Sequence, residues 1–326
     1  MSTATDAPVR YMDAINRGLA DALEADPTVV LMGIDVGAGG GIFTVTRGLA
    51  ERFGTERVLD TPISEMGYVG AAVGAAMTGL RPIVEIMFMD FIGVCLDPII
   101  NQAAKLRYMS AGALSAPMVF RTQTGAGRSA GAQHSQSLEA MLAHVPGLKV
   151  VMPATVTDAH DMLLAAVADP DPVVYIENRR LYAMKGALDE DPLPLGRARV
   201  ARAGEDVTVV TWGQMLRECL AAADASSASL EVIDLRSLVP LDIATVLASA
   251  QRTGRLLIVH EAVQDFGAGA EIAARAGDEL FDLLRVPVRR LGTPPVPMPF
   301  NPELERSVLP DAARIAAAAE ELVREG

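Results

Sequence analysis

The stretch of this chain that decides its fold is residues 60–79, DTPISEMGYVGAAVGAAMTG, in which Glu65 precedes a run of small and apolar residues. After Glu65, no charged side chain follows until Arg81. The run predicts a helix whose small residues let another backbone or a flat ligand come very close. A carboxylate at the start of this helix either interacts with free backbone N–H groups or serves chemistry, because a poorly solvated carboxyl group can share a proton with a ligand. Composition alone favours neither interpretation.

Short apolar segments alternate with helical segments on both sides of this stretch. The predicted strands are residues 29–33, 57–60, 82–88, 117–122, 148–152, 172–177, 207–213, 230–235, 256–260 and 286–291. The predicted helices include residues 9–24, 44–53, 91–109, 157–167 and 311–325. Strands of four to seven mostly apolar residues that alternate with helices predict an α/β fold with mostly parallel, buried sheets.

The rhythm breaks at residues 181–204, where Asp189-Glu-Asp-Pro-Leu-Pro lies near two glycines. We therefore expect two domains, at 1–190 and 205–326, joined by a linker at 191–204. A chain of 326 residues is long enough for both.

Composition limits the classes of function. The chain has 28 Lys and Arg against 41 Asp and Glu, a formal net charge of −13, which argues against nucleic acid or an anionic membrane as a partner. Cys95 and Cys219 lie far apart among apolar neighbours, so we expect two free thiols in a reducing compartment. The N-terminus lacks the pattern of a signal peptide, and we expect a cytoplasmic protein.

Two glycine-rich stretches invite comparison with nucleotide-binding loops. The run at 37–42, GAGGGI, does not fit G-x-G-x-x-G, because Ile42 occupies the last position. The run at 125–130, GAGRSA, fits the relaxed form that ends in Ala, but no acidic residue follows at the usual spacing of about 20 residues. Neither a P-loop nor a G-x-S-x-G elbow occurs, so hydride and phosphoryl transfer lack support.

His134 follows the second glycine-rich loop, beyond the carboxyl end of a predicted strand, where ligands bind in α/β sheets. A solvated loop histidine is the alternative interpretation. His260 and Glu261 end another predicted strand and are weaker candidates. Phe88 and Phe91 flank a third strand end, where a ring packs into the core or stacks on a planar ligand.

Several motifs together resemble the β subunits of the thiamine diphosphate-dependent, decarboxylating first component of 2-oxoacid dehydrogenase complexes. The matching segments are DTPISEMG (60–67), GLRPIVE (79–85), NQAAKLRYM (101–109), AQHSQS (132–137), HVPGLKVV (144–151), DLRSLVPLD (234–242) and GAGAEI (267–272). They occur in order over nearly the whole chain. The segments MFMDF (87–91) and GVC (93–95) lean towards acetoin-type members.

This resemblance implies an N-terminal, pyrimidine-binding parallel-sheet domain and a C-terminal transketolase-like α/β domain. It also implies an α2β2 heterotetramer with thiamine diphosphate at the α–β interface. In the family, a Gly-Asp-Gly motif of the α subunit holds the diphosphate and Mg²⁺. This chain contains no Gly-Asp-Gly, so a partner chain is the expected source of those contacts.

The resemblance also assigns roles to single residues. Glu65 matches the family glutamate that interacts with the pyrimidine ring nitrogen of the cofactor, and Phe91 matches the aromatic residue that packs against the pyrimidine. His134 matches a histidine that positions or protonates reaction intermediates and assists transfer to the lipoyl group. Some members bind K⁺ through backbone carbonyls, and the matching positions here are Met118, Ala166, Val167, Asp169 and Asp171.

One position departs from the family pattern. Members usually carry an acidic residue where this chain has Ile34, and that acid contributes to a proposed proton relay between two active sites. Ile34 cannot carry a proton, so the relay, and strict equivalence to a standard dehydrogenase, are open.

The leading hypothesis is a catalytic β subunit that decarboxylates a 2-oxo acid, or cleaves acetoin, and passes the acyl group to a lipoyl-bearing acyltransferase or another acyl carrier. A transketolase-like transfer of a two-carbon unit, from a ketose to another carrier, is the alternative reaction. A non-catalytic assembly subunit is the alternative class, against which the presence of both Glu65 and His134 speaks.

Overall fold

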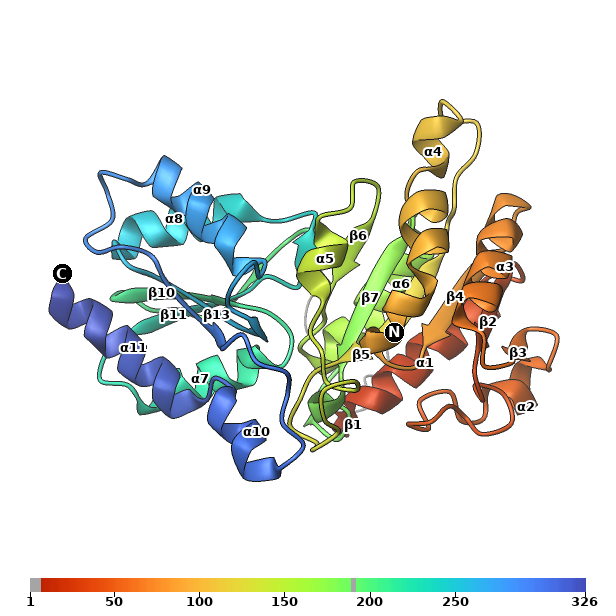
Figure 1. The fold of residues 1–326 in the computed structure, drawn as a ribbon, viewed down its shortest axis with the longest axis horizontal. Coiled ribbons are helices and arrows are strands. Elements are labelled where there is room, and N and C mark those ends of the chain that lie inside the picture. Colours follow the sequence, from red (N-terminus) through yellow and green to blue (C-terminus); the bar gives the residue numbers. More distant parts are fainter. Residues whose placement is uncertain (1–6, 189–191) are drawn as a thin grey trace. The chain divides into compact units, whose positions relative to one another are not determined.

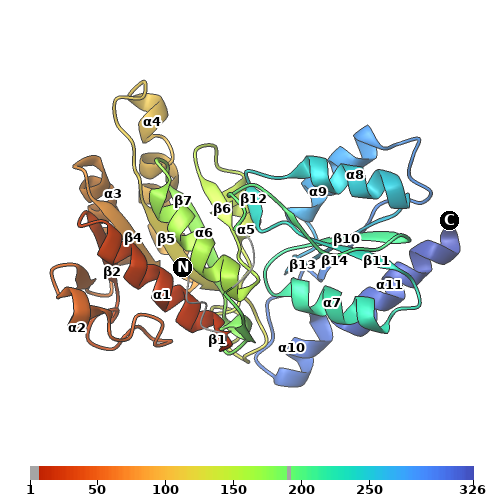
Figure 2. The same ribbon diagram turned by 180° about the vertical axis from the view of Figure 1, so that it is seen from behind.

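The computed structural model describes residues 7–188 and 192–326. These form two units (Figures 1 and 2). The N-terminal unit comprises the described residues up to 124 together with 141–195, and the C-terminal unit comprises 125–140 together with 196–326. The segment 125–140 thus belongs to the C-terminal unit. Residues 1–6 and the acidic residues 189–191 of the expected linker lie outside the described residues, and the expected domain boundaries stay a prediction.

The N-terminal unit is built on a parallel sheet in which strands follow the order β6-β7-β5-β4-β2-β3. These strands are β2 (Val29–Gly33), β3 (Val58–Asp60), β4 (Arg81–Ile86), β5 (Val119–Thr124), β6 (Lys149–Val151) and β7 (Val173–Asn178). The register pairs Gly33 with Glu85 and Glu85 with Arg121. Polar side chains near the carboxyl ends of adjacent strands therefore lie in one row.

Helices and two short strands complete this unit. They are β1 (Val9–Arg10), α1 (Tyr11–Ala25), α2 (Leu49–Phe53), α3 (Glu65–Met77), η1 (Met89–Cys95), η2 (Asp97–Ala103), α4 (Leu106–Met109), α6 (Val156–Ala168), η3 (Arg179–Leu181) and β8 (Lys185–Gly186). In sequence, α5 (Glu139–Ala143) spans the change from one unit to the other. β1 pairs antiparallel with β8.

The core of the N-terminal unit forms where α1 and α6 pack together on one face of the sheet (Figure 2). Tyr11, Ile15, Leu19 and Leu23 of α1 are buried, as their helical spacing predicts. The Tyr11 hydroxyl donates to the carbonyl of Pro153 at 2.9 Å, so its polar end is satisfied inside the core.

The C-terminal unit has a smaller sheet in the order β14-β13-β10-β11-β9, parallel except for the edge strand β9. Helices α8 and α9 cover one face, and α7 and α11 cover the other (Figures 1 and 2). The strands of this sheet are β9 (Arg199–Arg202), β10 (Val207–Thr211), β11 (Leu230–Asp234), β13 (Leu256–Val263) and β14 (Arg289–Thr293). The unit also contains the short strand β12 (Ser237–Val239). The helices are α7 (Met215–Ala225), α8 (Ile243–Thr253), α9 (Gly269–Glu279), α10 (Pro302–Val308) and α11 (Ala312–Glu325).

The structure corrects two predicted helices. The helix expected at 44–53 forms only as α2, because Thr44 and Gly48 have left-handed φ angles of 60° and 81°, which no right-handed helix accommodates. The helix expected at 91–109 is divided into the 3₁₀-helix η1, the π-helix η2 and the short α4. Pro98 lies at the start of η2 and has no N–H to continue a regular ladder.

No helix in residues 7–188 and 192–326 combines the length and hydrophobicity needed to cross a membrane.

Candidate active site

Glu65 is the first residue of α3 and is buried, with 8% of its surface exposed. The preceding residue, Ser64, makes no side-chain cap bond, so the backbone N–H groups of the first turn are left to other partners. A carboxylate at this position interacts favourably with the positive end of the helix dipole. The structure thus places a buried acid, and not a solvated one, at the start of the small-residue helix.

The charge of Glu65 contributes to the pKa shifts of two buried groups, Cys95 and Tyr68. Burial raises the pKa of the Cys95 thiol to about 12, and the nearby Glu65 charge adds to that rise. Burial also raises the pKa of the Tyr68 hydroxyl, again with a smaller contribution from Glu65. The Tyr68 hydroxyl donates to the carbonyl of Glu85 at 3.2 Å. Glu65 therefore faces surroundings in which charge is weakly screened.

Phe91, in η1, belongs to a cluster of aromatic rings. The ring centroids of Phe91 and Phe88 lie 5.5 Å apart in an edge-to-face arrangement, and Phe88 and Phe43 repeat this geometry at 5.5 Å. The guanidinium of Arg179 lies over the Phe88 ring, 5.4 Å from its centroid. The thiol of Cys95 lies 3.6 Å from the Phe91 carbonyl and donates to it, so Phe91 and Glu65 share a neighbour.

A buried ion network lies beside this cluster. Arg121 of β5 binds Glu85 of β4 and both oxygens of Glu177 of β7, at 3.0 Å for Nη2 to Oε2. Burial raises the pKa of Glu177, and Arg121 opposes the rise. Tyr182 also donates to Glu177, and its ring meets Phe43 edge to face with centroids 5.8 Å apart. Ionic and aromatic groups therefore form one contact chain from β5 to Phe91.

Sequence reasoning did not single out this network. A charged residue inside an otherwise apolar, buried strand was the available signal, and it occurs at Glu85, Arg121 and Glu177. A buried charge needs a partner, so three such positions on neighbouring strands would have predicted their pairing.

His134 is half-buried and lies in the C-terminal unit, on the loop that joins β5 to α5. Its backbone N–H donates to the carbonyl of Gly131 at 3.4 Å. The same loop contacts two carboxylates of its own unit, since Ala126 N–H donates to Glu261 and Gly127 N–H donates to Glu305. The structure thus gathers Glu65 and Phe91 in the N-terminal unit and places His134 in the C-terminal unit.

Four of the five carbonyls at the expected K⁺ positions already accept hydrogen bonds. Met118 O accepts from Val173 N–H at 3.0 Å, and Ala166 O accepts from Asp169 N–H at 3.3 Å. Arg81 Nη1 donates to Val167 O at 2.7 Å and to Asp169 O at 3.3 Å. A carbonyl oxygen has two lone pairs, so each of these oxygens keeps capacity for a second partner.

Positive side chains also occupy the neighbourhood of these carbonyls. Lys149 Nζ lies 2.5 Å from the Asp169 carboxylate, and Arg107 Nε lies 2.5 Å from the carboxylate of Asp171. Each of these cations pairs with a carboxylate, as does Arg81 with Asp26, so the surroundings of the carbonyls carry little net positive charge.

Among residues 7–188 and 192–326, no three His, Cys, Asp or Glu side chains gather closely enough to hold a metal ion. The described part of this chain thus offers no carboxylate cluster of its own for Mg²⁺.

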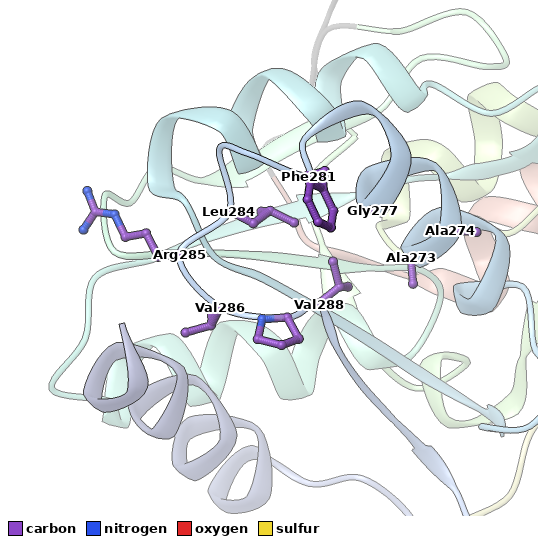
Figure 3. Close-up of a pocket in the computed structure, with 9 residues that line it drawn as sticks. Ala273, Ala274, Gly277, Phe281, Leu284, Arg285, Val286 and Val288 are labelled. Carbon is purple, nitrogen blue, oxygen red and sulfur yellow. The ribbon is translucent and has the colours of Figure 1, made fainter.

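A separate hollow in the C-terminal unit lies between α9 and the segment 281–288 (Figure 3). Phe281 and Leu284 point towards it, over a floor that includes Ala273 and Gly277, while the guanidinium of Arg285 extends away. Among the described residues, Arg285 is the one charged residue that lines the hollow. It therefore lacks the convergent polar groups that catalysis needs.

Two family models give the class of this protein, which is transketolase-type. Residues 7–185 match the transketolase pyrimidine binding domain, and residues 196–315 match the transketolase C-terminal domain. A solved structure described as a split-gene transketolase, inactive beta4 tetramer, has a TM-score of 0.78 to this chain at 23% identity. The match covers 98% of this chain and 99% of that chain, and it confirms the expected two-domain fold.

Relatives of known name give the family. The beta subunit of acetoin:2,6-dichlorophenolindophenol oxidoreductase from Cupriavidus necator is 44% identical over 96% of this chain and 97% of its own. The mitochondrial pyruvate dehydrogenase E1 component subunit beta-2 of Oryza sativa subsp. japonica is 46% identical over 94% and 84%. The 2-oxoisovalerate dehydrogenase subunit beta of Bacillus subtilis is 42% identical over 96% and 98%. This chain belongs to the family of E1 beta subunits of 2-oxoacid and acetoin dehydrogenases, which confirms the resemblance seen in its motifs.

Proposed function

We propose that this chain is the β subunit of a thiamine diphosphate-dependent enzyme that transfers an acyl unit. The observation that carries this proposal is the burial of Glu65 at the start of α3, beside Cys95 and Tyr68. A carboxyl group in such surroundings suits the exchange of a proton with a heteroaromatic nitrogen. Glu65 and its buried surroundings therefore fit the pyrimidine half of the cofactor.

Each site residue has a separate task in this proposal. Thiamine diphosphate supplies the carbon nucleophile that adds to a carbonyl group. Glu65 shares a proton with the pyrimidine ring nitrogen and so sets the tautomer of that ring. Phe91 packs against the ring, with Phe88 supporting it edge to face. His134 donates or accepts a proton on the substrate side, and it assists transfer to the acceptor.

Other groups would come from partners. The names of the relatives describe beta subunits of larger enzymes, and we propose an α subunit that completes an α2β2 assembly with this chain. That subunit would hold the diphosphate and most of the Mg²⁺ ligands. A lipoyl-bearing acyltransferase, or another acyl carrier, would accept the acyl unit. K⁺ at the carbonyls of Met118, Ala166, Val167, Asp169 and Asp171 is a further proposal.

The proposed substrates are small 2-oxo acids or acetoin. The relatives are named for acetoin, pyruvate and 2-oxoisovalerate, so the family name leaves the choice open. Ile34 is buried directly after β2 and cannot carry a proton, which keeps a ketose donor as an alternative. Assays of the purified α–β pair with 2-oxo acids, acetoin and ketose phosphates separate these substrates, and activity with ketose phosphates alone would overturn acyl transfer to a lipoyl carrier.

The test of the site is Glu65→Gln in the reconstituted α–β pair. Glutamine keeps the size of the side chain but cannot exchange the proton, so turnover should fall by at least about 100-fold while assembly is unchanged. The matched control is Glu56→Gln, because Glu56 is exposed. Turnover and size-exclusion elution are the measurements. Wild-type turnover in Glu65→Gln would contradict the role of Glu65.

A further inference from the structure

The glycine-rich run at 125–131 has an unusual backbone. Left-handed φ angles occur at every second residue: Gly125 (101°), Gly127 (88°), Ser129 (53°) and Gly131 (76°). Alternation of left-handed with other conformations turns neighbouring N–H groups towards one side, which is the geometry of anion-binding nests. The run also matches the relaxed phosphate-binding pattern, for which the proposed function has no use.

In this chain the N–H groups of the run meet two carboxylates. Ala126 N–H donates to Glu261 Oε1 at 2.5 Å. Gly127 N–H donates to Glu305 Oε1 at 2.8 Å, and Ser129 N–H donates to the other oxygen, Oε2, at 3.0 Å. All of these residues belong to the C-terminal unit. In a nucleotide-binding protein, N–H groups of this kind bind a phosphate. Here they bind the side chains of Glu261 and Glu305 instead.

Both carboxylates are buried deeply enough for these bonds to matter. Glu305, in α10, is 2% exposed, and Glu261, in β13, is 9% exposed. Burying a carboxylate is costly unless hydrogen bonds compensate the lost water, and backbone N–H bonds to a charged acceptor are among the stronger ones. The carboxylates and the loop therefore stabilise each other.

These contacts fix the first part of the loop at 125–138, which carries His134, a proposed catalytic residue. His134 lies five residues beyond Ser129, the last residue bound to Glu305. Gly131, between them, lies against the ring of Phe300, close enough that an added Cβ would come within 3.5 Å of it. At the far end of the loop, the Trp212 indole N–H donates to Glu139 at 3.2 Å. The loop is thus attached to the C-terminal unit on both sides of His134.

We propose that Glu305 and Glu261 are positioning residues, which act as an internal anion that locks the loop at 125–138 and orients His134. This proposal rests on the proposed role of His134, but the locking itself does not. The lock needs no ligand, so the loop is ordered before substrate arrives. Positioning in advance lowers the cost of reaching the reactive geometry.

The test compares Glu305→Ala, Glu305→Gln and a matched control, Glu303→Gln, in the full-length chain assembled with its α partner. Glu303 lies on the same helix but is exposed. Alanine removes both acceptors, whereas glutamine keeps one oxygen that still accepts an N–H. Hydrogen exchange of peptides covering 125–138 should accelerate by about tenfold or more in Glu305→Ala, less in Glu305→Gln, and not in Glu303→Gln.

Turnover of the same variants tests the positioning of His134. We expect kcat to fall most in the variant whose loop exchanges hydrogen fastest, by about tenfold in Glu305→Ala. The KM for substrate should stay nearly unchanged. Unchanged exchange at 125–138 in Glu305→Ala would overturn the lock. Faster exchange with unchanged kcat would overturn the positioning, provided that His134→Ala is inactive. If His134→Ala keeps wild-type turnover, the role of His134 fails, while exchange still decides the lock.

Discussion

The hydroxyl of Tyr182 donates a 2.7 Å hydrogen bond to Glu177, the carboxylate that also binds Arg121. Tyr182 has a second contact, since its ring meets Phe43, the next member of the aromatic cluster that ends at Phe91. One side chain therefore joins the buried charges of the sheet to the ring proposed to hold the cofactor. The first two predictions test the two ends of this connection.

Arg121→Met should destabilise the N-terminal unit by about 3–5 kcal/mol, because it leaves Glu85 and Glu177 buried without a cation. Urea unfolding followed by circular dichroism measures the loss. Arg10→Met is the matched control, since Arg10 pairs with Asp13 at the exposed surface and its loss should change stability little. Equal effects of the two substitutions would contradict a structural role for the network.

Phe88→Leu should weaken the binding of thiamine diphosphate to the α–β pair by about fivefold, because it removes the ring that supports Phe91. At saturating cofactor, kcat should stay near the wild-type value. Titration of turnover against cofactor concentration gives both quantities. Phe281→Leu serves as the control because Phe281 is exposed on the C-terminal unit, and the prediction fails if both variants bind cofactor alike.

His260 should make the C-terminal unit less stable in acid. Burial lowers the pKa of His260 to about 4, and its ring stacks on Trp212 with centroids 5.3 Å apart. Above about pH 6.5, His260 is neutral in both folded and unfolded states. Between about pH 6.5 and about 4 the unfolded state binds the proton first, so stability falls as pH falls, by about 3 kcal/mol in total.

The single tryptophan, Trp212, allows this loss to be followed by fluorescence during urea unfolding. His260→Gln cannot take up the proton, so its midpoint should vary less with pH in the same window. Parallel pH profiles for the variant and the wild type would show that other groups cause the acid sensitivity.

Both thiols should resist Ellman's reagent in the folded protein. Cys95 and Cys219 are buried, and burial raises the pKa of each thiol to about 12, so almost no thiolate exists at pH 8. Colour should appear only after addition of guanidinium chloride, with two thiols per chain. Rapid reaction of either thiol in the native chain would contradict the burial.

K⁺ should raise the melting temperature only slightly, because Arg81 already donates to Val167 and Asp169. At tenfold excess over its Kd, a bound ion adds about 1.4 kcal/mol, which corresponds to a few degrees in a chain of this size. Thermal unfolding in KCl and in NaCl at equal ionic strength measures the difference. Identical melting curves would remove the case for a K⁺ site.

Local patterns were sufficient for much of the fold. Apolar strands that alternate with helices predicted both parallel sheets, and helical spacing predicted the buried face of α1. Failures occurred where the backbone leaves the common conformations. The left-handed Thr44 and Gly48 shorten one helix, and Pro98 lies where another is divided, because single positions override a periodic pattern.

The site was only partly visible in the sequence. Glu65 was found because it stands alone in an apolar run, whereas the network around Arg121 joins three strands and has no local pattern. Glu305 could not be found, because its partner Gly127 lies 178 residues away in sequence. Such contacts depend on which unit a loop joins, and chain order does not give that choice.

The membership of 125–140 in the C-terminal unit has a consequence for any attempt to divide this protein. A fragment that stops at residue 190 would keep the amides of the glycine-rich run but lose Glu261 and Glu305, and a fragment that starts at 205 would keep those acids without the amides. Each fragment would therefore contain only the hydrogen-bond donors or only the acceptors of these contacts. The two units are therefore poor candidates for exchange as separate modules between related proteins, even though each has its own sheet.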